Sequence, residues 1–409
     1  MYIRRHIEEA VLRRAKMKGA VVVTGSRQVG KTTLIENLKP EIPKVTLDDL
    51  PTRQRAIHSP STFFNITPPP IFVDEVQYAP EIFHYIKILL DDSQNKGDFY
   101  LTGSQSFELM KNVTESLAGR AGILELLGLS LREIIGDDWN VPFMPTFEYL
   151  RERNSNANKK TVLRIPEIWK IIHRGCLPEL ALNLDYDWAD FYADYIKTYI
   201  ERDVRRLTQV ADEDSFYKFI TVCAAMSGQL LNLTSLANDV GISVPTAKRW
   251  LSVLKTSGII YLLKPYSNNA IKRAVKTPKL HFLDIGLASY LTRWMGADNL
   301  SIGANNGSFF ESFVLSEILK SYRNAGKDAD LYFLRDGNKK EIDLLIHESN
   351  TLYPVEIKTK AEPDEKDIKN FNLLDAIKGV NIGEGGIICL ADKLLQLNEK
   401  NYIIPLSMV

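Results

Sequence analysis

The stretch AVVVTGSRQVGKTT, residues 20–33, places a short apolar run directly before a loop of the pattern G-x-x-x-x-G-K-[ST]. The apolar run is typical of a buried strand, and TTLIENL at the end of the loop is expected to form a helix. Such a loop can turn its backbone N–H groups toward phosphate oxygens, and the amino terminus of the helix adds partial positive charge. The residues expected to bind the phosphates of ATP are Gly25, Ser26, Gln28, Val29, Gly30, Lys31, Thr32 and Thr33.

A pair of acids follows farther along the chain. The segment IFVDE, residues 71–75, is an apolar strand that ends in Asp74 and Glu75, which is the Walker B arrangement. We expect Asp74 and the hydroxyl of Thr32 to hold Mg²⁺, Glu75 to polarise the attacking water, and Lys31 to reach the β and γ phosphates. The sequence therefore predicts binding of ATP with Mg²⁺ and hydrolysis of that ATP.

Three more side chains are candidates for the same reaction. The strand FYLTGS, residues 99–104, ends in Thr102 and Ser104, either of which could hydrogen-bond the γ phosphate or the water. An ordinary turn at the end of a strand is the alternative explanation of these residues. Arg120 is a candidate arginine finger, because the transferred phosphoryl group needs a cation beyond Lys31, and a solvated surface arginine is the alternative.

The composition is typical of an ordinary globular protein. Hydrophobic residues make up 45% of the 409 residues and charged residues 25%. Lys plus Arg and Asp plus Glu number 51 each, so the whole molecule has no net field that attracts nucleic acid or a membrane. The three cysteines have no zinc-site or disulfide spacing, and no apolar stretch approaches the roughly 20 residues of a membrane span. We expect a cytoplasmic protein with no membrane partner.

The motifs TGSRQVGKTT, IFVDEVQ, LTGS and LAGR occur in this order, followed by YIERDV at 199–204 and KLHFLDIGLASYL at 279–291. Together they resemble the prokaryotic AAA-type ATPases of the AAA+ superfamily that carry a carboxy-terminal domain of unknown function. The resemblance spans nearly the whole chain and implies ATP binding and the order of the domains. It also suggests a homo-oligomer in which Arg120 could act on a neighbouring copy.

The segment 215–285 is expected to be a winged-helix domain. LTSLANDV, residues 233–240, is a helix stopped by Gly241, and Ser243 caps a second helix that Gly258 stops. On the second helix, Val244, Ala247, Leu251 and Leu254 should face the core. A domain that only packs against its neighbours is the alternative to DNA binding. The residues expected to contact double-stranded DNA are Thr246, Lys248, Arg249 and Ser252 on the second helix, and Lys272 and Arg273 in the loop from 265 to 278.

The carboxy-terminal strands EIDLLI and YPVEIK carry acids and a lysine that can converge. Alternation predicts that Asp343 shares a face with Glu341, opposite Ile342, Leu344 and Ile346, and that Glu356 and Lys358 share a face. The D…ExK spacing after a helix resembles the PD-(D/E)XK nucleases. That resemblance implies that Asp343 and Glu356 are metal ligands, Lys358 the catalytic lysine and Glu311 the helix acid, with Mg²⁺ or Mn²⁺ as a second divalent ion. Charged residues that alternate on a half-exposed hairpin are the alternative.

The sequence thus predicts an α/β protein built around a P-loop ATPase with a parallel sheet. The expected parts are a P-loop AAA-type ATPase domain at 1–145, a helical linker or lid at 146–214, a winged-helix domain at 215–285 and a small α/β nuclease-like domain at 286–409. We expect a nucleotide-driven switch that acts on DNA. The alternative is a regulatory NTPase whose appended domains bind protein and have no nuclease activity.

Overall fold

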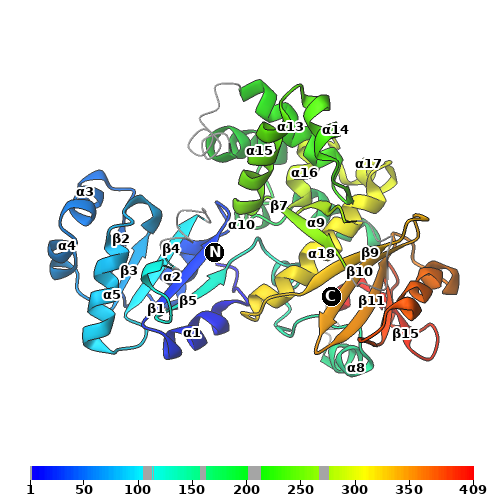
Figure 1. Cartoon of the computed structure of the whole chain (residues 1–409), viewed down its shortest axis with the longest axis horizontal. Helices are drawn as coiled ribbons and strands as arrows, with labels where there is room; N and C mark the ends of the chain where they lie inside the picture. The colour runs from blue at the N-terminus through cyan, green and yellow to red at the C-terminus, as the bar shows by residue number, and fades with distance from the viewer. Residues whose placement is uncertain (1, 105–112, 114, 157–162, 201–212, 267–275) are drawn as a thin grey trace.

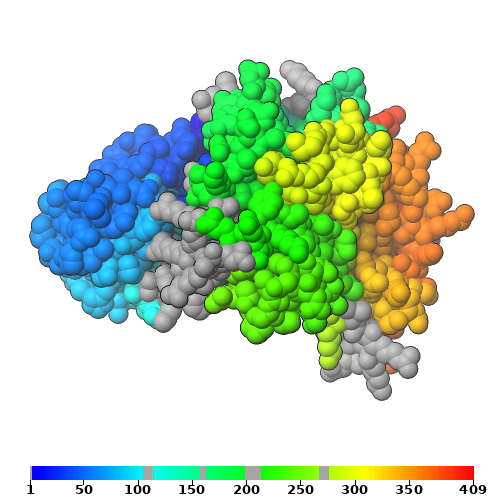
Figure 2. Space-filling view, turned by 90° about the horizontal axis from the view of Figure 1, so that it is seen from above, coloured from blue at the N-terminus to red at the C-terminus, as the bar shows by residue number. Residues whose placement is uncertain are grey.

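The computed structural model describes residues 2–104, 113, 115–156, 163–200, 213–266 and 276–409. Two sheets lie at opposite ends of the molecule, with helical segments between them and along one side (Figure 1). The same order holds from above: the amino-terminal part lies at one end, the carboxy-terminal part at the other, and the middle of the chain between them (Figure 2).

The first sheet is parallel throughout, with the strand order β2-β3-β4-β1-β5. Its strands are β1 (Ala20–Gly25), β2 (Lys44–Thr46), β3 (Ile71–Asp74), β4 (Phe99–Ser104) and β5 (Ala121–Glu125). The helices around it are α1 (Glu8–Met17), α2 (Lys31–Leu38), α3 (Leu50–His58), α4 (Pro60–Ile66) and α5 (Ile82–Ser93), with a 3-10 turn η1 (Val76–Tyr78). The predicted α/β fold with a parallel sheet is confirmed for this part.

Both faces of this sheet are buried, which explains why β1 is apolar without interruption. Ala20 and Val22 pack in a cluster with residues of α4 and α5, whereas Val21 and Val23 pack in a cluster with residues of α1 and α2. The register pairs Gly25 with Ser104, so the carboxyl ends of the neighbouring strands β1 and β4 meet at one edge. The phosphate loop, the Walker B acids and the end of β4 therefore lie together.

Helices connect the first sheet to the second part of the chain. They are α7 (Leu131–Ile134), α8 (Phe147–Asn156), α9 (Ile165–Arg174), α10 (Pro178–Leu182), α11 (Trp188–Tyr195) and the π-helix η2 (Ile196–Ile200). The next elements are α13 (Glu213–Ala225), β6 (Gln229–Leu230), α14 (Leu233–Val240), α15 (Val244–Thr256), β7 (Ile260–Pro265) and β8 (Lys279–Phe282). Strand β6, which pairs with β8, had no sequence prediction.

The predicted pair of helices lies where the capping residues indicate. Gly241 ends α14 in the left-handed conformation, and the Ser243 side chain accepts a hydrogen bond from the Thr246 N–H at the start of α15. The prediction that Val244 faces the core is wrong: it is 39% exposed, because it occupies the first position of α15, before the helix reaches the core. Trp250 is buried instead. The other residues predicted to face inward are buried: Ala247, Leu251 and Leu254.

The second sheet has ten strands and the order β14-β15-β13-β11-β10-β9-β7-β8-β6, with β12 beside β11. Its remaining strands are β9 (Leu331–Arg335), β10 (Glu341–Glu348), β11 (Thr351–Ile357), β12 (Asn381–Ile382), β13 (Gly385–Cys389), β14 (Leu395–Gln396) and β15 (Asn401–Pro405). The helices here are α16 (Ile285–Leu291), α17 (Ala297–Ile302) and α18 (Asn306–Asn324), with 3-10 segments η3 (Glu365–Ala376) and η4 (Leu406–Met408). Strand β7 pairs in parallel with β9 and so joins the β6–β8 strands to the carboxy-terminal strands.

A β-bulge corrects the predicted faces of β10. The pairing of β10 with β9 shifts register between Ile342 and Leu345. As a result Ile342 and Leu345 lie in one apolar cluster, and Leu344 and Ile346 lie in the other. The prediction that Ile342, Leu344 and Ile346 share one face is therefore wrong, because the extra residue in the bulge reverses the alternation.

The apolar core runs through the molecule, since one cluster of buried side chains extends from Val21 of β1 to Val409. Helix α18 lies between the two sheets (Figure 1). The domain limits at 145, 214 and 285 stay predictions. The last limit falls at the start of α16, between strands β8 and β9, which belong to the same sheet. Within the described residues, no helix is long and apolar enough to cross a membrane.

Candidate functional site

The phosphate loop connects β1 to α2 and needs glycine at both ends. Gly25 has φ +150°, and a Cβ added there would lie 2.1 Å from the carbonyl oxygen of Leu126. Gly30 has φ +90° and Gln28 has φ +60°. Because left-handed and right-handed residues alternate in such loops when they turn successive N–H groups inward, this backbone is suited to an anion.

Lys31 lies inside the loop. Its side chain is buried, and Nζ donates to the carbonyl oxygens of Gly25 at 3.2 Å and Ser26 at 2.8 Å. The ammonium group therefore lies within the loop, where it can also pair with a bound phosphate.

Asp74 is held by hydroxyl groups. Its two carboxylate oxygens accept hydrogen bonds from Thr32 Oγ1 at 3.0 and 3.1 Å, and Oδ1 also accepts one from Thr102 Oγ1. Asp74 is 7% exposed, and Thr102 is fully buried beside it. A carboxylate and a threonine hydroxyl in contact at the amino terminus of a helix form an all-oxygen pair, which suits Mg²⁺.

Glu75 is hydrogen-bonded to Gln77, a residue that the sequence motifs did not indicate. Its backbone is left-handed, with φ +58°, and its Oε2 accepts a hydrogen bond from Gln77 Nε2. The same nitrogen donates to Ser104 Oγ at 3.2 Å. Thr102 and Ser104 therefore have different partners: Thr102 contacts the expected metal ligand, and Ser104 contacts the group that holds Glu75.

Arg120 lies apart from these residues. Its guanidinium donates to both carboxylate oxygens of Asp91, at 2.5 and 2.8 Å, and this pairing holds the pKa of Asp91 below its usual range. Arg120 is not among the described residues that line the cavity at the phosphate loop. Its role as an arginine finger stays a prediction.

A cavity of about 640 Å³ opens at the phosphate loop. This volume lies within the range of small-molecule sites. Three distant parts of the chain line the cavity. They are the amino-terminal residues Tyr2, Ile3 and Arg5; the first sheet and its loops, with Arg27, Gln28, Gly30, Lys31, Thr32, Thr33, Asp48, Glu75 and Leu129; and the α10 region, with Pro178, Glu179, Leu182 and Asn183. Only the phosphate-loop residues and Glu75 had a motif to indicate them.

Comparisons with known proteins agree with this geometry. Residues 17–135 match a family model described as an AAA domain. This part of the chain is an AAA-type P-loop domain. Residues 165–298 and 306–409 match two models that are each described as a domain of unknown function (DUF8612 and DUF4143).

Two relatives match most of this chain. An uncharacterised protein of Mycobacterium tuberculosis is 29% identical over 368 residues, which cover 89% of this chain and 76% of that protein. An uncharacterised protein of Methanocaldococcus jannaschii is 22% identical over 344 residues, which cover 81% and 69%. Among solved structures, a Walker-type ATPase of Pyrococcus abyssi is 15% identical with a TM-score of 0.46, over 71% of this chain and 96% of that chain. The Thermotoga maritima RuvB Holliday junction branch migration motor is 16% identical with a TM-score of 0.28, over 62% and 85%.

The AAA-type domain contacts the α15–β7 turn. A Cβ added to Gly258, which follows α15, would lie 3.5 Å from the Cβ of Ser26 in the phosphate loop. On α15 itself Lys248, Arg249 and Ser252 are exposed, whereas Thr246 is half-buried and bonds Ser243. Lys272 and Arg273, the other two residues expected to contact DNA, lie outside the described residues.

The carboxy-terminal residues Asp343, Glu356 and Lys358 converge as expected. Lys358 Nζ donates to Asp343 Oδ2 at 3.0 Å and to Glu356 Oε2 at 2.7 Å. Burial and the Asp343 charge raise the pKa of Glu356 to about 9. Burial alone would raise the pKa of Asp343, but Lys358 and then Lys279 outweigh it and lower that pKa.

Glu311 is held by another lysine, Lys279 of β8. Lys279 is 2% exposed, and its Nζ lies 2.8 Å from Glu311 Oε1 and 2.5 Å from Glu341 Oε1. Burial raises the pKa of Glu311 to about 7, although Lys279 opposes the shift. Among the described residues, no group of three or more His, Cys, Asp or Glu is arranged to hold a metal ion. Lysine ammonium groups thus occupy the positions between these acids, and no sequence motif indicated Lys279.

Proposed function

We propose that this protein binds ATP with Mg²⁺ and hydrolyses it to ADP and phosphate. The observation that carries the proposal is the contact of Thr32 with Asp74 beside Lys31, at the wall of a cavity large enough for a nucleotide. Thr32 and Asp74 would hold the metal, Lys31 would neutralise the phosphates, and Glu75 would orient the attacking water. Thr102 would keep Asp74 in place, and Ser104 would act on Glu75 through Gln77.

The test is Mg-ATP binding by calorimetry together with phosphate release. Lys31→Ala should remove most binding, because the buried ammonium is lost from the centre of the loop. Lys16→Ala, at an exposed lysine of α1, is the matched control and should bind as the wild type does. Equal binding by the wild type and Lys31→Ala would overturn the proposal.

We infer that the nucleoside end of ATP lies between the amino-terminal segment and α10. The cavity wall is apolar at Ile3, Pro178 and Leu182, which suits a flat base. Leu182→Asn should weaken ATP binding but leave binding of inorganic tripolyphosphate unchanged, because tripolyphosphate has no base and the amide adds no charge. An equal loss of affinity for ATP and for tripolyphosphate would show that the base does not lie at Leu182.

We propose that ATP turnover drives a switch on double-stranded DNA through a winged-helix unit that includes α14 and α15. The exposed Lys248 and Arg249, on a helix whose following turn packs on Ser26, support this proposal. The alternative is a switch that binds protein partners. Hydrolysis measured with and without duplex DNA separates the two, since only a DNA-directed switch should change its rate with DNA and lose that change at high salt.

For the carboxy-terminal sheet we propose a nuclease-like arrangement that does not cleave DNA. The support is that Lys279 and Lys358 neutralise the acids that a second Mg²⁺ or Mn²⁺ would need. Incubation of the full chain with duplex DNA and either ion should leave the DNA intact, and cleavage that Asp343→Asn abolishes would overturn this proposal.

Arg120 is proposed to act on the ATP of a neighbouring copy if the AAA-type domains assemble into a homo-oligomer. Mixing Arg120→Ala with Lys31→Ala protein should then restore part of the turnover, because some sites combine an intact loop with an intact finger. If mixed oligomers form without any recovery, Arg120 has no such role.

A further inference from the structure

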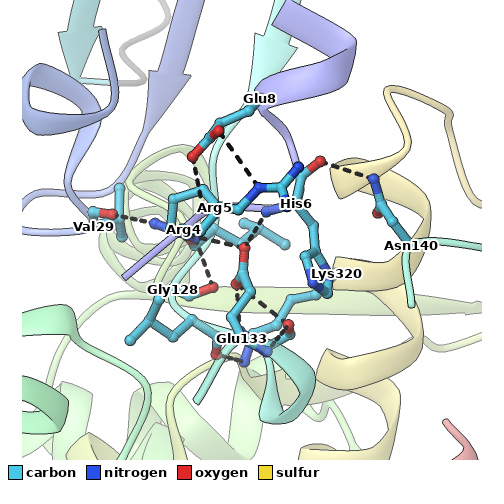
Figure 3. Close-up of polar contacts among 12 residues, drawn as sticks. Arg4, Arg5, His6, Glu8, Val29, Gly128, Glu133, Asn140 and Lys320 are labelled. Carbon is cyan, nitrogen blue, oxygen red and sulfur yellow. Dashed lines mark hydrogen bonds and ion pairs between the residues drawn. The ribbon is translucent and has the colours of Figure 1, made fainter. Parts of the chain in front are cut away.

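Arg5 lies beside the phosphate loop, at the wall of the same cavity. It is 3% exposed, and its Nη1 donates to the carbonyl oxygen of Val29 at 2.7 Å. Its Nη2 donates to the carbonyl oxygens of Leu127 at 2.8 Å and Gly128 at 3.3 Å, and Nε donates to Glu133 Oε1 at 3.0 Å. Figure 3 shows the guanidinium reaching Val29, Gly128 and Glu133, which belong to separate segments of the chain.

The bond to Val29 fixes one peptide of the loop. In a trans peptide the C=O and the N–H point in opposite directions, so a Val29 carbonyl held by Arg5 turns the Gly30 N–H away from Arg5. Gly30 has φ +90° and no side chain to restrain it, so this peptide could otherwise rotate at low cost. A loop that binds phosphate through its N–H groups depends on this orientation.

The carboxylate of Glu133, which pairs with Arg5, is itself buried. Glu133 of α7 also accepts hydrogen bonds from the N–H groups of His6 and Ser130, each at 2.8 Å. Burial would raise its pKa, but Arg5 and these bonds outweigh burial and lower it, so Glu133 stays charged. Arg5 therefore retains its charged partner at neutral pH.

Helix α7 is in turn held by α18. Glu317 Oε2 accepts from the Leu131 N–H at 2.7 Å, and Lys320 Nζ donates to the Leu129 carbonyl at 2.9 Å and to Glu317 Oε1 at 2.8 Å. The side chains of Glu317 and Lys320, both on α18, are buried. Polar contacts thus lead from Val29 through Arg5 to Glu133, and the backbone around α7 connects Glu133 to the contacts with α18.

We propose that Arg5 is a positioning residue for the phosphate loop, and that α18 determines the phosphate affinity of the loop through Glu133 and α7. The proposal rests on the ATP binding proposed above. It makes the carboxy-terminal part of the chain a regulator of the AAA-type domain: a partner that shifts α18 would change the affinity for ATP.

The first test is Arg5→Lys in the full chain. Lysine can pair with Glu133, but it lacks the planar fork that reaches several carbonyl oxygens. The dissociation constants for Mg-ATP and for tripolyphosphate should both rise about tenfold, as for the loss of a charged hydrogen bond. The KM for ATP should rise by a similar factor and kcat should fall less, whereas partial misfolding would lower kcat and leave KM unchanged. Arg4→Lys, at the exposed neighbour, is the control.

The second test is Glu317→Gln, a change on α18 outside the cavity. It should raise both dissociation constants by about threefold, since a hydrogen bond to a charged acceptor becomes one to a neutral acceptor. Wild-type affinity in Arg5→Lys would overturn the positioning role, and wild-type affinity in Glu317→Gln would overturn the link to α18. If Arg5→Lys does not fold, the two dissociation constants of Glu317→Gln alone test the proposal. If the wild type binds neither ligand, the proposed function fails and this inference fails with it.

Discussion

The two pairs of acids in this chain, Asp74 with Glu75 and Asp343 with Glu356, differ in what neutralises them. Asp74 accepts hydrogen bonds from the hydroxyl groups of Thr32 and Thr102, which carry no charge. Asp343 and Glu356 share the ammonium group of Lys358. Hydroxyl groups leave the negative charge in place for a cation, whereas an ammonium group removes that need. The first pair is thus left open to a cation, whereas the second pair is already bridged by Lys358.

The largest expected difference between the pairs is in ATP turnover. Glu75→Gln should lower kcat about 100-fold to 1000-fold with little change in the affinity for ATP, because the amide cannot polarise water as a carboxylate does. The equivalent change Glu356→Gln should leave kcat unchanged. Phosphate release and calorimetry on both variants measure this, and a wild-type kcat in Glu75→Gln would show that its proposed role is wrong.

The next effect concerns stability. Lys279→Met should lower the free energy of unfolding by about 3–5 kcal/mol, since it leaves Glu311 and Glu341 without their buried cation. Mn²⁺ should then raise the unfolding temperature of Lys279→Met by more than that of the wild type, because the variant has lost the cation between Glu311 and Glu341. An equal Mn²⁺ stabilisation of the two proteins would contradict this account of the carboxy-terminal acids.

A smaller effect is expected in the pH dependence of stability. Glu356 retains its proton in the folded chain from its ordinary pKa of 4.5 up to about 9, where the unfolded chain has lost it. Proton binding then favours the folded state, so stability should fall as pH rises through this window, by at most about 1.4 kcal/mol per pH unit. Glu311 contributes a fall of the same sign up to about pH 7.

Glu356→Gln should flatten this fall, because the amide does not titrate. Chemical denaturation at several pH values in the window measures the slope, with Glu362→Gln at an exposed site as the control. An unchanged slope between about pH 7 and pH 9 would mean that Glu356 is ionised in the folded chain at neutral pH.

The smallest effect is expected on DNA binding. Lys248→Ala with Arg249→Ala should weaken duplex binding and reduce its salt slope by about one unit for each phosphate contact that is lost. Lys255→Ala, at an exposed lysine in the last turn of the same helix, should change the slope less. Equal salt slopes in the wild type, the double variant and Lys255→Ala would show that the DNA contact does not lie on the first turns of α15.

The sequence sufficed where a known motif marks the end of a strand in the parallel sheet. Lys31, Thr32 and Asp74 could be predicted because a loop after one strand and an acid at the end of another meet at the same edge of a parallel sheet. Gln77 had a usable signal, since it follows Glu75 by two positions and is polar. The bulge in β10 had no recognised signal, because Ile342, Leu344 and Leu345 suit a strand and Asp343 also fits a site residue.

Contacts between distant segments could not be predicted. Lys279 reaches Glu311 and Glu341 from another strand, and in the sequence it is one lysine among many. Arg5 and Leu182 join the cavity because the chain folds back on the AAA-type domain, and no local pattern records that return. Motifs therefore located the acids and the phosphate loop, but not the groups that neutralise the acids or enclose the cavity.

The parallel pairing of β7 with β9 has a consequence for how this protein folds. Between these strands the chain forms β8 and the helices α16 to α18, so β7 leaves the ribosome long before its partner does. Until β9 is made, one edge of β7 has no neighbour, and a bare strand edge invites pairing with other chains. We therefore expect the nascent chain to depend on chaperones during this interval. Once β9 has paired, the strands on either side should unfold together, in a single transition.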